Sequence, residues 1–241
     1  MTSKGSDKLN QVFDDESIST RWRGLYKAGG IVAIILLILT VAQMVVFLAS
    51  PPPSTVEGFF TLFQTNWLRG LLSLDLIYII INALLILLYL VLYIVLKRTN
   101  EFAITVALIL GLVGIAAYFS SNTSFQMLSL SNHFTTAATD AQRSVYLGAG
   151  EALLATYSGT AFDVYYILNA ITLLIFSIVM LKSDIFSRAM AYLGIAAGLL
   201  MLIPSTAGTV GIYFSLVSLI PWIVFLILFT RRVLWLDSHL T

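Results

Sequence analysis

The chain has 241 residues, of which 59% are hydrophobic and only 10% are charged, and its mean hydropathy is +0.95. Water-soluble domains carry about 25% charged residues, so this composition excludes a soluble globular protein and predicts one that uses the bilayer as its solvent. The formal net charge of +1 gives no basic bias and therefore no indication of a nucleic-acid partner. The absence of cysteine excludes disulfides, thiolate metal ligands and thiol catalysis.

Six apolar stretches are long enough to cross a hydrocarbon core about 30 Å thick, which needs roughly 20 residues of helix. In chain order they cover about residues 28–49, 71–96, 102–119, 162–181, 189–203 and 210–230. We therefore predict an all-α, polytopic transmembrane helix bundle with six spans over residues 27–232. Residues 1–26 form an N-terminal segment and residues 233–241 a C-terminal tail, both expected in the cytoplasm.

The distribution of lysine and arginine sets the expected orientation, because cytoplasmic loops carry an excess of both residues. With the N-terminus inside, only Arg69 and Arg143 face outward among the 13 basic residues. The cytoplasmic ones are Lys4, Lys8, Arg21, Arg23, Lys27, Lys97, Arg98, Lys182, Arg188, Arg231 and Arg232. This bias supports an even number of spans and predicts a multi-pass protein of the plasma membrane with both termini in the cytoplasm.

The longest connection, about residues 120–161, joins the third and fourth predicted spans on the outer side. Its centre, residues 139–157, is predicted to be helical, because Asp140 suits the first turn of a helix and Gly159 breaks the run before the fourth span. We expect this helix to form a structured outer cap on the bundle.

Several motifs in this region resemble a large prokaryotic membrane family of unknown activity. One group is Ala-Gln-Arg-Ser at 141–144, Gly-Glu-Ala-Leu-Leu-Ala-Thr-Tyr at 150–157 and Gly-Thr-Ala-Phe at 159–162. A second is Val-Met-Leu-Lys-Ser at 179–183, Phe-Ser-Arg-Ala at 186–189 and Ala-Tyr-Leu-Gly-Ile at 191–195. Together they resemble the uncharacterised six-helix family known as domain-of-unknown-function family 4386, most clearly over residues 136–203. The resemblance implies fold and topology, and it brings no activity or catalytic residues.

Polar groups inside a membrane are costly and are therefore candidates for function. In the second span, Asp75, Tyr78 and Asn82 share one helical face, and Tyr166 and Asn169 lie in the fourth span. We predict an outward-opening polar pocket that also includes Glu151 from the outer helix and Asp163. The alternative is that these groups form hydrogen bonds between helices and specify packing, each adding about 0.6 kcal/mol.

Other chemistry has little support in the sequence. The two histidines, His133 and His239, lie in a loop and in the tail, so we expect no metal site, no cofactor and no catalytic residue. Gly194 and Gly198 have the spacing of close helix packing, which we attribute to contacts within the bundle, while a homo-oligomer is left open.

The leading functional hypothesis is a non-enzymatic binding or accessory protein whose polar site faces the outer side. Its expected partners are membrane lipids and a small-molecule or lipid ligand. The alternative is a small secondary transporter that uses the outer carboxylates of Asp75 and Asp163. An enzyme acting on lipid comes third, because acids without a metal or an activated nucleophile leave its chemistry undetermined.

Overall fold

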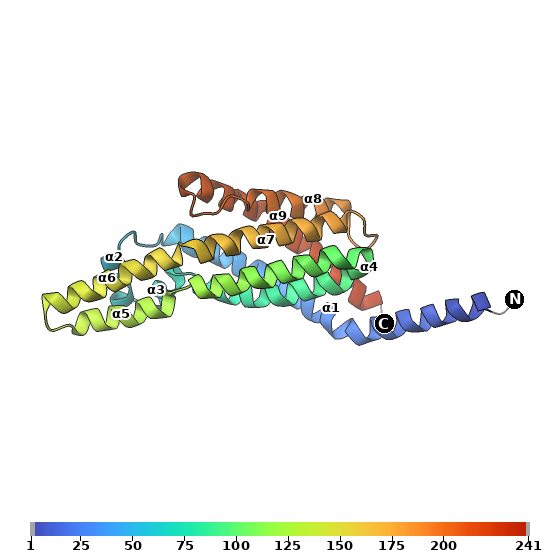
Figure 1. Ribbon diagram of the computed structural model, residues 1–241, viewed down its shortest axis with the longest axis horizontal. Helices are drawn as coiled ribbons and strands as arrows, with labels where there is room; N and C mark the ends of the chain where they lie inside the picture. Colours follow the sequence, from blue (N-terminus) through green and yellow to red (C-terminus); the bar gives the residue numbers. More distant parts are fainter. Residues whose placement is uncertain (1–2, 240–241) are drawn as a thin grey trace.

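The computed structural model describes the backbone of residues 3–239 and the side chains of residues 24–238, and this part of the chain is helical without a strand (Figure 1). The predicted all-α class is therefore confirmed. Four basic residues used for the orientation, Lys4, Lys8, Arg21 and Arg23, have side chains outside the described set. The helices are α1 Ser3–Ala49, α2 Val56–Thr65, α3 Trp67–Ser73, α4 Leu76–Ser121, α5 Ser124–Thr136, α6 Asp140–Tyr157, α7 Thr160–Met180, α8 Arg188–Leu200 and α9 Gly208–His239.

Four helical stretches in the described residues are long and apolar enough to cross a membrane. They are Gly24–Ala49, Leu76–Thr136, Asp140–Met180 and Gly208–Ser238, and α8 is a shorter apolar helix. Large apolar side chains lie exposed along α1 and α9, as a lipid-facing surface requires: Ile38 is 61% exposed and Ile220 is 66% exposed. Four stretches by length are fewer than the six expected from the sequence, and α4 explains part of the difference.

The α4 helix turns back on itself at Asn100, whose φ of −160° and ψ of 89° are not helical. The Asn100 side chain accepts a hydrogen bond from Ala103 N (3.1 Å) and so caps the second leg. The two legs lie alongside each other (Figure 1). They approach so closely that a Cβ added at Gly111 would lie 2.6 Å from the ring of Tyr89. Residues 97–101, which separate two of the predicted apolar stretches, are therefore the place where the chain reverses its direction.

The predicted start of the second span at residue 71 is wrong. Residues up to Ser73 belong to α3, and α4 begins only at Leu76. Between them Asp75 adopts a left-handed conformation, with φ 64° and ψ 34°. Aspartate tolerates this region better than most residues do, because its short side chain forms local hydrogen bonds. Apolar pattern alone does not reveal such a break.

Helices α2, α3, α5 and α6 form a small separate core, which we call the end cluster, at one end of the elongated bundle (Figure 1). The predicted helix over residues 139–157 is confirmed as α6, with Thr139 capping it through a hydrogen bond from Gln142 N (3.2 Å). The sequence interpretation missed the other three helices. The buried residues of the cluster are Val56, Phe59, Phe60, Phe63, Leu71, Leu74 and Met127.

The main core lies between α1, both legs of α4, α7, α8 and α9. Thr172 of α7 donates to the carbonyl oxygen of Ala107 (3.1 Å), which fixes α7 against the second leg. On α8, a Cβ at Gly194 would lie 2.0 Å from Ser177 Oγ, and one at Gly198 would lie 2.8 Å from Leu174 Cγ. The small residues of α8 therefore serve packing against α7 within the chain.

At the end opposite the cluster, α1 and α9 come into close contact. A Cβ at Gly30 would lie 2.4 Å from Leu234 Cδ2, and a Cβ at Gly29 would lie 2.6 Å from Val91 Cγ2. Arg232 donates a hydrogen bond to the carbonyl oxygen of Ile185, in the turn between α7 and α8. The bundle is thus closed at this end by direct packing of α1, α4, α7 and α9.

Replacing Gly111 tests the folded-back arrangement of α4. Gly111→Ala is expected to destabilise the protein by about 1–3 kcal/mol, because the added methyl group meets the Tyr89 ring and Thr172 in a packed core. Gly148→Ala, with nothing within 4 Å of the new Cβ, is the matched control and is expected to be neutral or stabilising by up to about 1 kcal/mol. Thermal melting in detergent measures both, and equal melting of the two variants would contradict the arrangement.

Candidate functional site

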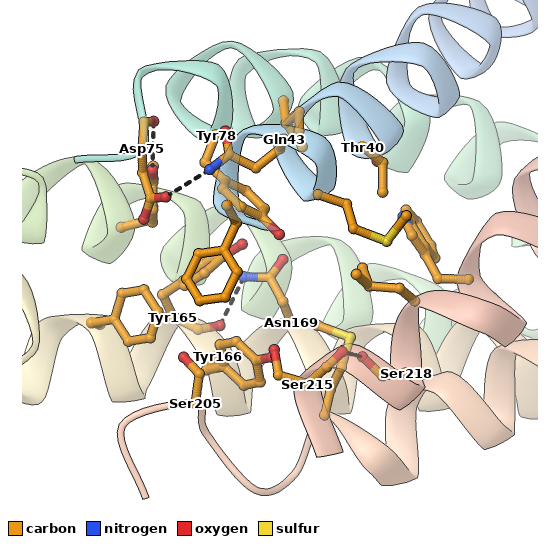
Figure 2. A pocket seen from close by; sticks show the side chains of 18 of the residues that line it. Thr40, Gln43, Asp75, Tyr78, Tyr165, Tyr166, Asn169, Ser205, Ser215 and Ser218 are labelled. Carbon is orange, nitrogen blue, oxygen red and sulfur yellow. Dashed lines mark hydrogen bonds between the residues drawn. The ribbon is translucent and has the colours of Figure 1, made fainter. Parts of the chain in front are cut away.

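A cavity of about 420 Å³ lies between α1, the first leg of α4, α7 and α9 (Figure 2). Along α4 its lining runs from Asp75 to Leu92, a helical length of about 25 Å. Asp75 lies at one end of the lining, and farther along Leu88, Leu92 and Phe225 line the cavity beside the hydrogen-bonded pair Tyr89 and Asn169. Such a volume falls within the range of about 300–1,000 Å³ typical of small-molecule sites.

The mouth of the cavity lies where exposed residues contribute to its lining. These residues are Phe47, Pro52, Ser158, Thr206 and Ile212. They come from the end of α1, the segment that follows it, the junction of α6 with α7, the connection from α8 to α9, and the start of α9. The cavity therefore opens on the side of the end cluster and is closed toward the packed end of α1 and α9.

Asp75 lies at the polar end of the cavity and accepts hydrogen bonds from two other helices. Gln43 of α1 donates through Nε2 to Oδ1 (3.2 Å), and the hydroxyl group of Tyr157, the last residue of α6, donates to Oδ2. The hydroxyl of Tyr118 donates to the Asp75 backbone carbonyl (3.3 Å). The carboxylate thus joins α1 and the end cluster to the bundle while part of its surface remains accessible from the cavity.

A second polar group lines one wall of the cavity, which we call the tyrosine–asparagine wall. Its residues are Tyr89, Tyr166, Asn169 and Ser215. Tyr89 donates to Asn169 Oδ1 (2.5 Å), and Asn169 Nδ2 donates to the backbone carbonyl of Tyr165 (2.9 Å). Tyr166 and Ser215 of α9 share a hydrogen bond of 2.5 Å. Two of these bonds join α7 to α4 and α9, so they fix the shape of the wall as well as its polarity.

The family comparison covers most of the chain. A family model described as a domain of unknown function (DUF4386) matches residues 27–236. The chain belongs to this family. No curated protein and no solved structure gives a significant match. The match therefore supports the resemblance found in the sequence motifs, and it assigns no activity to any residue.

The structure brings four of the seven predicted site residues together at the cavity wall: Asp75, Tyr78, Tyr166 and Asn169. Asn82 is fully buried beside them and donates to the Tyr165 hydroxyl (3.4 Å) without lining the cavity. Whether any of these residues binds a ligand stays a prediction.

Two predicted residues are placed elsewhere. Asp163 lies at the edge of the cavity, where it accepts a hydrogen bond from Thr206 (2.5 Å), a residue of the mouth. Glu151 is exposed on α6 and does not line the cavity. The end cluster contributes Tyr157 to the site in place of Glu151.

Sequence reasoning also missed Gln43. This residue is the only amide in the first apolar stretch, and a buried amide in a predicted span is a signal that would have found it. It is 6% exposed, and its Oε1 atom has no hydrogen-bond partner among the described residues. Tyr157 was harder to find, since a tyrosine at the end of an outer helix looks like an interface residue.

Within the described residues, no group of three or more histidine, cysteine, aspartate or glutamate side chains is placed to hold a metal ion. His133 instead stacks on Tyr146 in the end cluster, with ring centroids 5.8 Å apart. What the cavity can do chemically is bind: it offers one carboxylate, several hydroxyl and amide groups, and a long apolar surface.

The structural contribution of the tyrosine–asparagine wall can be measured by removing one hydroxyl group. Tyr89→Phe leaves Asn169 Oδ1 without its donor and is expected to destabilise the protein by about 0.5–2 kcal/mol. Tyr192→Phe, at a tyrosine of α8 that is 61% exposed, is the matched control and should change little. Unfolding in detergent followed by circular dichroism reports both, and an unchanged Tyr89→Phe would show that this bond contributes nothing.

Proposed function

We propose that the protein is a non-enzymatic binding or accessory protein of the plasma membrane that holds an amphiphilic molecule in its cavity, with the mouth on the outer side. The observation that carries this proposal is the polarity of the cavity: a carboxylate at one end, and leucine and aromatic side chains at the other. Amphiphiles such as lipids have the same polarity, and the bilayer supplies them. A small-molecule site with a few convergent polar groups on an apolar wall has this general form.

The proposed topology has six crossings: α1, the two legs of α4, α7, α8 and α9. The legs Leu76–Thr99 and Glu101–Ser121 are about 36 Å and 31 Å long, enough for a hydrocarbon core of about 30 Å. The α8 helix covers only about 20 Å, and we propose that residues 201–207 complete its crossing. Gly30, early in the first crossing, packs against Leu234, near the end of the last one. The chain therefore enters and leaves the bundle at the same end, which is consistent with an even number of crossings.

Positive charge supports the outward direction of the mouth. Arg232, near the end of α9, contacts the α7–α8 turn, which holds Lys182 and leads into Arg188 at the start of α8. The reversal of α4 carries Lys97 and Arg98. These residues belong to the end of the bundle opposite the end cluster. The positive-inside rule therefore supports a cytoplasmic position for this end, with the end cluster and the mouth on the outer side.

Filling the cavity tests the binding proposal. Leu219→Trp adds a large side chain to the lining, and it should lower the amount of added dodecyl maltoside that the protein retains by at least about tenfold, because space for the chain is lost. Ile220→Trp is the matched control: it is the next residue on α9, is 66% exposed and faces away from the cavity. Native mass spectrometry of both variants from the same lipid nanodiscs gives the comparison.

Equal retention by the two tryptophan variants and by the unaltered protein would contradict a ligand in this cavity. Loss of ligand from both variants would indicate damage to the fold, so a melting curve of each variant accompanies the measurement.

Transport is the second candidate function. The observation that favours it is a cavity open at one end and closed at the other, with Asp75 inside it and Asp163 at its edge. Asp75→Asn or Asp163→Asn would then abolish proton- or sodium-coupled uptake in proteoliposomes. Absence of uptake by the unaltered protein across a solute panel would remove this candidate and leave the binding function.

A further inference from the structure

We infer that the cavity selects an amphiphile with a cationic, ammonium-type headgroup, which lies at Asp75 with its chain extending toward Leu92 and Phe225. This inference rests on the proposed function and names its ligand class. Its starting point is charge: among the described residues that line the cavity, Asp75 is the only carboxylic acid and none is a lysine, arginine or histidine. A cationic headgroup supplies the missing opposite charge.

Neither hydrogen bond to the Asp75 side chain supplies a positive charge. Both donors that reach the carboxylate, the Gln43 amide and the Tyr157 hydroxyl, are neutral. A carboxylate has about four acceptor sites, so two remain for a ligand. Arg69 donates to Ser50 at the rim (3.5 Å) with an exposed side chain, and within the described residues no hydrogen bond joins it to Asp75.

Gln43 adds a second negatively polarised oxygen beside Asp75. Its Nε2 faces the Asp75 carboxylate, which fixes the orientation of the amide because only the nitrogen can donate. Its Oε1 is buried and has no partner in the part of the chain that the structure describes. This unpaired oxygen puts a further partial negative charge beside Asp75, and at low dielectric constant that charge favours a positive group in the adjacent cavity.

An aromatic wall lies on the other side of the headgroup region. Tyr118, Tyr165 and Tyr166 form one buried group, with the Tyr118 and Tyr165 ring centroids 4.8 Å apart and those of Tyr165 and Tyr166 6.2 Å apart. Figure 2 shows Tyr165 and Tyr166 facing the space across from Gln43. Aromatic faces attract ammonium groups, and such contacts strengthen where water is excluded.

The same features disfavour anionic and neutral amphiphiles. A carboxylate or sulfate headgroup at this end would face Asp75 as a like charge in a site of low dielectric constant. A neutral headgroup such as maltoside can donate hydrogen bonds to Asp75 but supplies no countercharge, so it is expected to bind, more weakly than a cation. The deep end, where Leu88, Leu92 and Trp222 line the cavity, accepts an alkyl chain of any of the three classes, so headgroup charge is the property that discriminates among them.

Trp222 gives a direct reporter for the chain end, because no other tryptophan with a described side chain lines the cavity. The test uses the full chain with Trp22, Trp67 and Trp235 replaced by phenylalanine, in nanodiscs of neutral phospholipid. Dodecyltrimethylammonium brominated at its methyl end is titrated in, and saturable quenching of Trp222 fluorescence is expected. Asp75→Asn should weaken the apparent affinity by at least about tenfold. Asp140→Asn, an exposed acid of α6, should leave it unchanged.

The same brominated chain carrying a sulfate or a maltoside headgroup completes the test. Comparable affinity for all three headgroups, or no effect of Asp75→Asn, would overturn the cation selectivity and leave the proposed amphiphile site standing. No saturable quenching by any of them would overturn both. Asparagine tolerates the left-handed backbone of position 75, and the headgroup comparison on the unaltered Asp75 protein decides the question even if that variant does not fold.

Discussion

The position of Asp75 is the constraint on which the rest of the site depends. Its left-handed backbone ends the turn after α3 and starts the first leg of α4, so it sets the angle between the end cluster and the bundle. Its side chain and carbonyl group are reached by Gln43, Tyr157 and Tyr118. One residue therefore joins α1, both legs of α4 and α6. Any ligand at this carboxylate would act on the place where these parts are held together.

The cavity follows from an asymmetry in the packing of α1 and α9. Glycines allow close approach at one end, where Gly30 contacts Leu234. Toward the other end the same two helices carry Gln43, Ser215 and Trp222, and space remains between them. The Asp75 carboxylate and the Gln43 carbonyl oxygen, which has no hydrogen-bond partner among the described residues, lie beside that space. Because buried polar groups without partners are costly, packing alone does not account for this pair.

Much of the fold was predictable because it depends on local features of the sequence. The α6 helix follows from an aspartate suited to its first turn and a glycine break after it, and the reversal of α4 follows from a short polar run between two apolar ones. The start of α4 was not predictable, since Asp75 sits within an unbroken apolar stretch and its conformation is set by contacts with α1 and α6. The sequence could predict which helical faces of the apolar spans are polar, and Tyr78 and Asn169 on those faces do line the cavity. It could not predict that Glu151 is exposed on the surface of α6. Which residue of a surface helix turns inward depends on tertiary packing.

The central claim is that the cavity opens to the outside of the cell and is occupied there by an amphiphile. The protein lacks cysteine, so a single Ser158→Cys at the mouth can be labelled without background. In intact cells a membrane-impermeant maleimide should label this cysteine, and added dodecyltrimethylammonium should slow the labelling. Ser183→Cys, in the α7–α8 turn, should react only after permeabilisation. Labelling of Ser158→Cys only in permeabilised cells, or at a rate that the amphiphile leaves unchanged, would contradict the account.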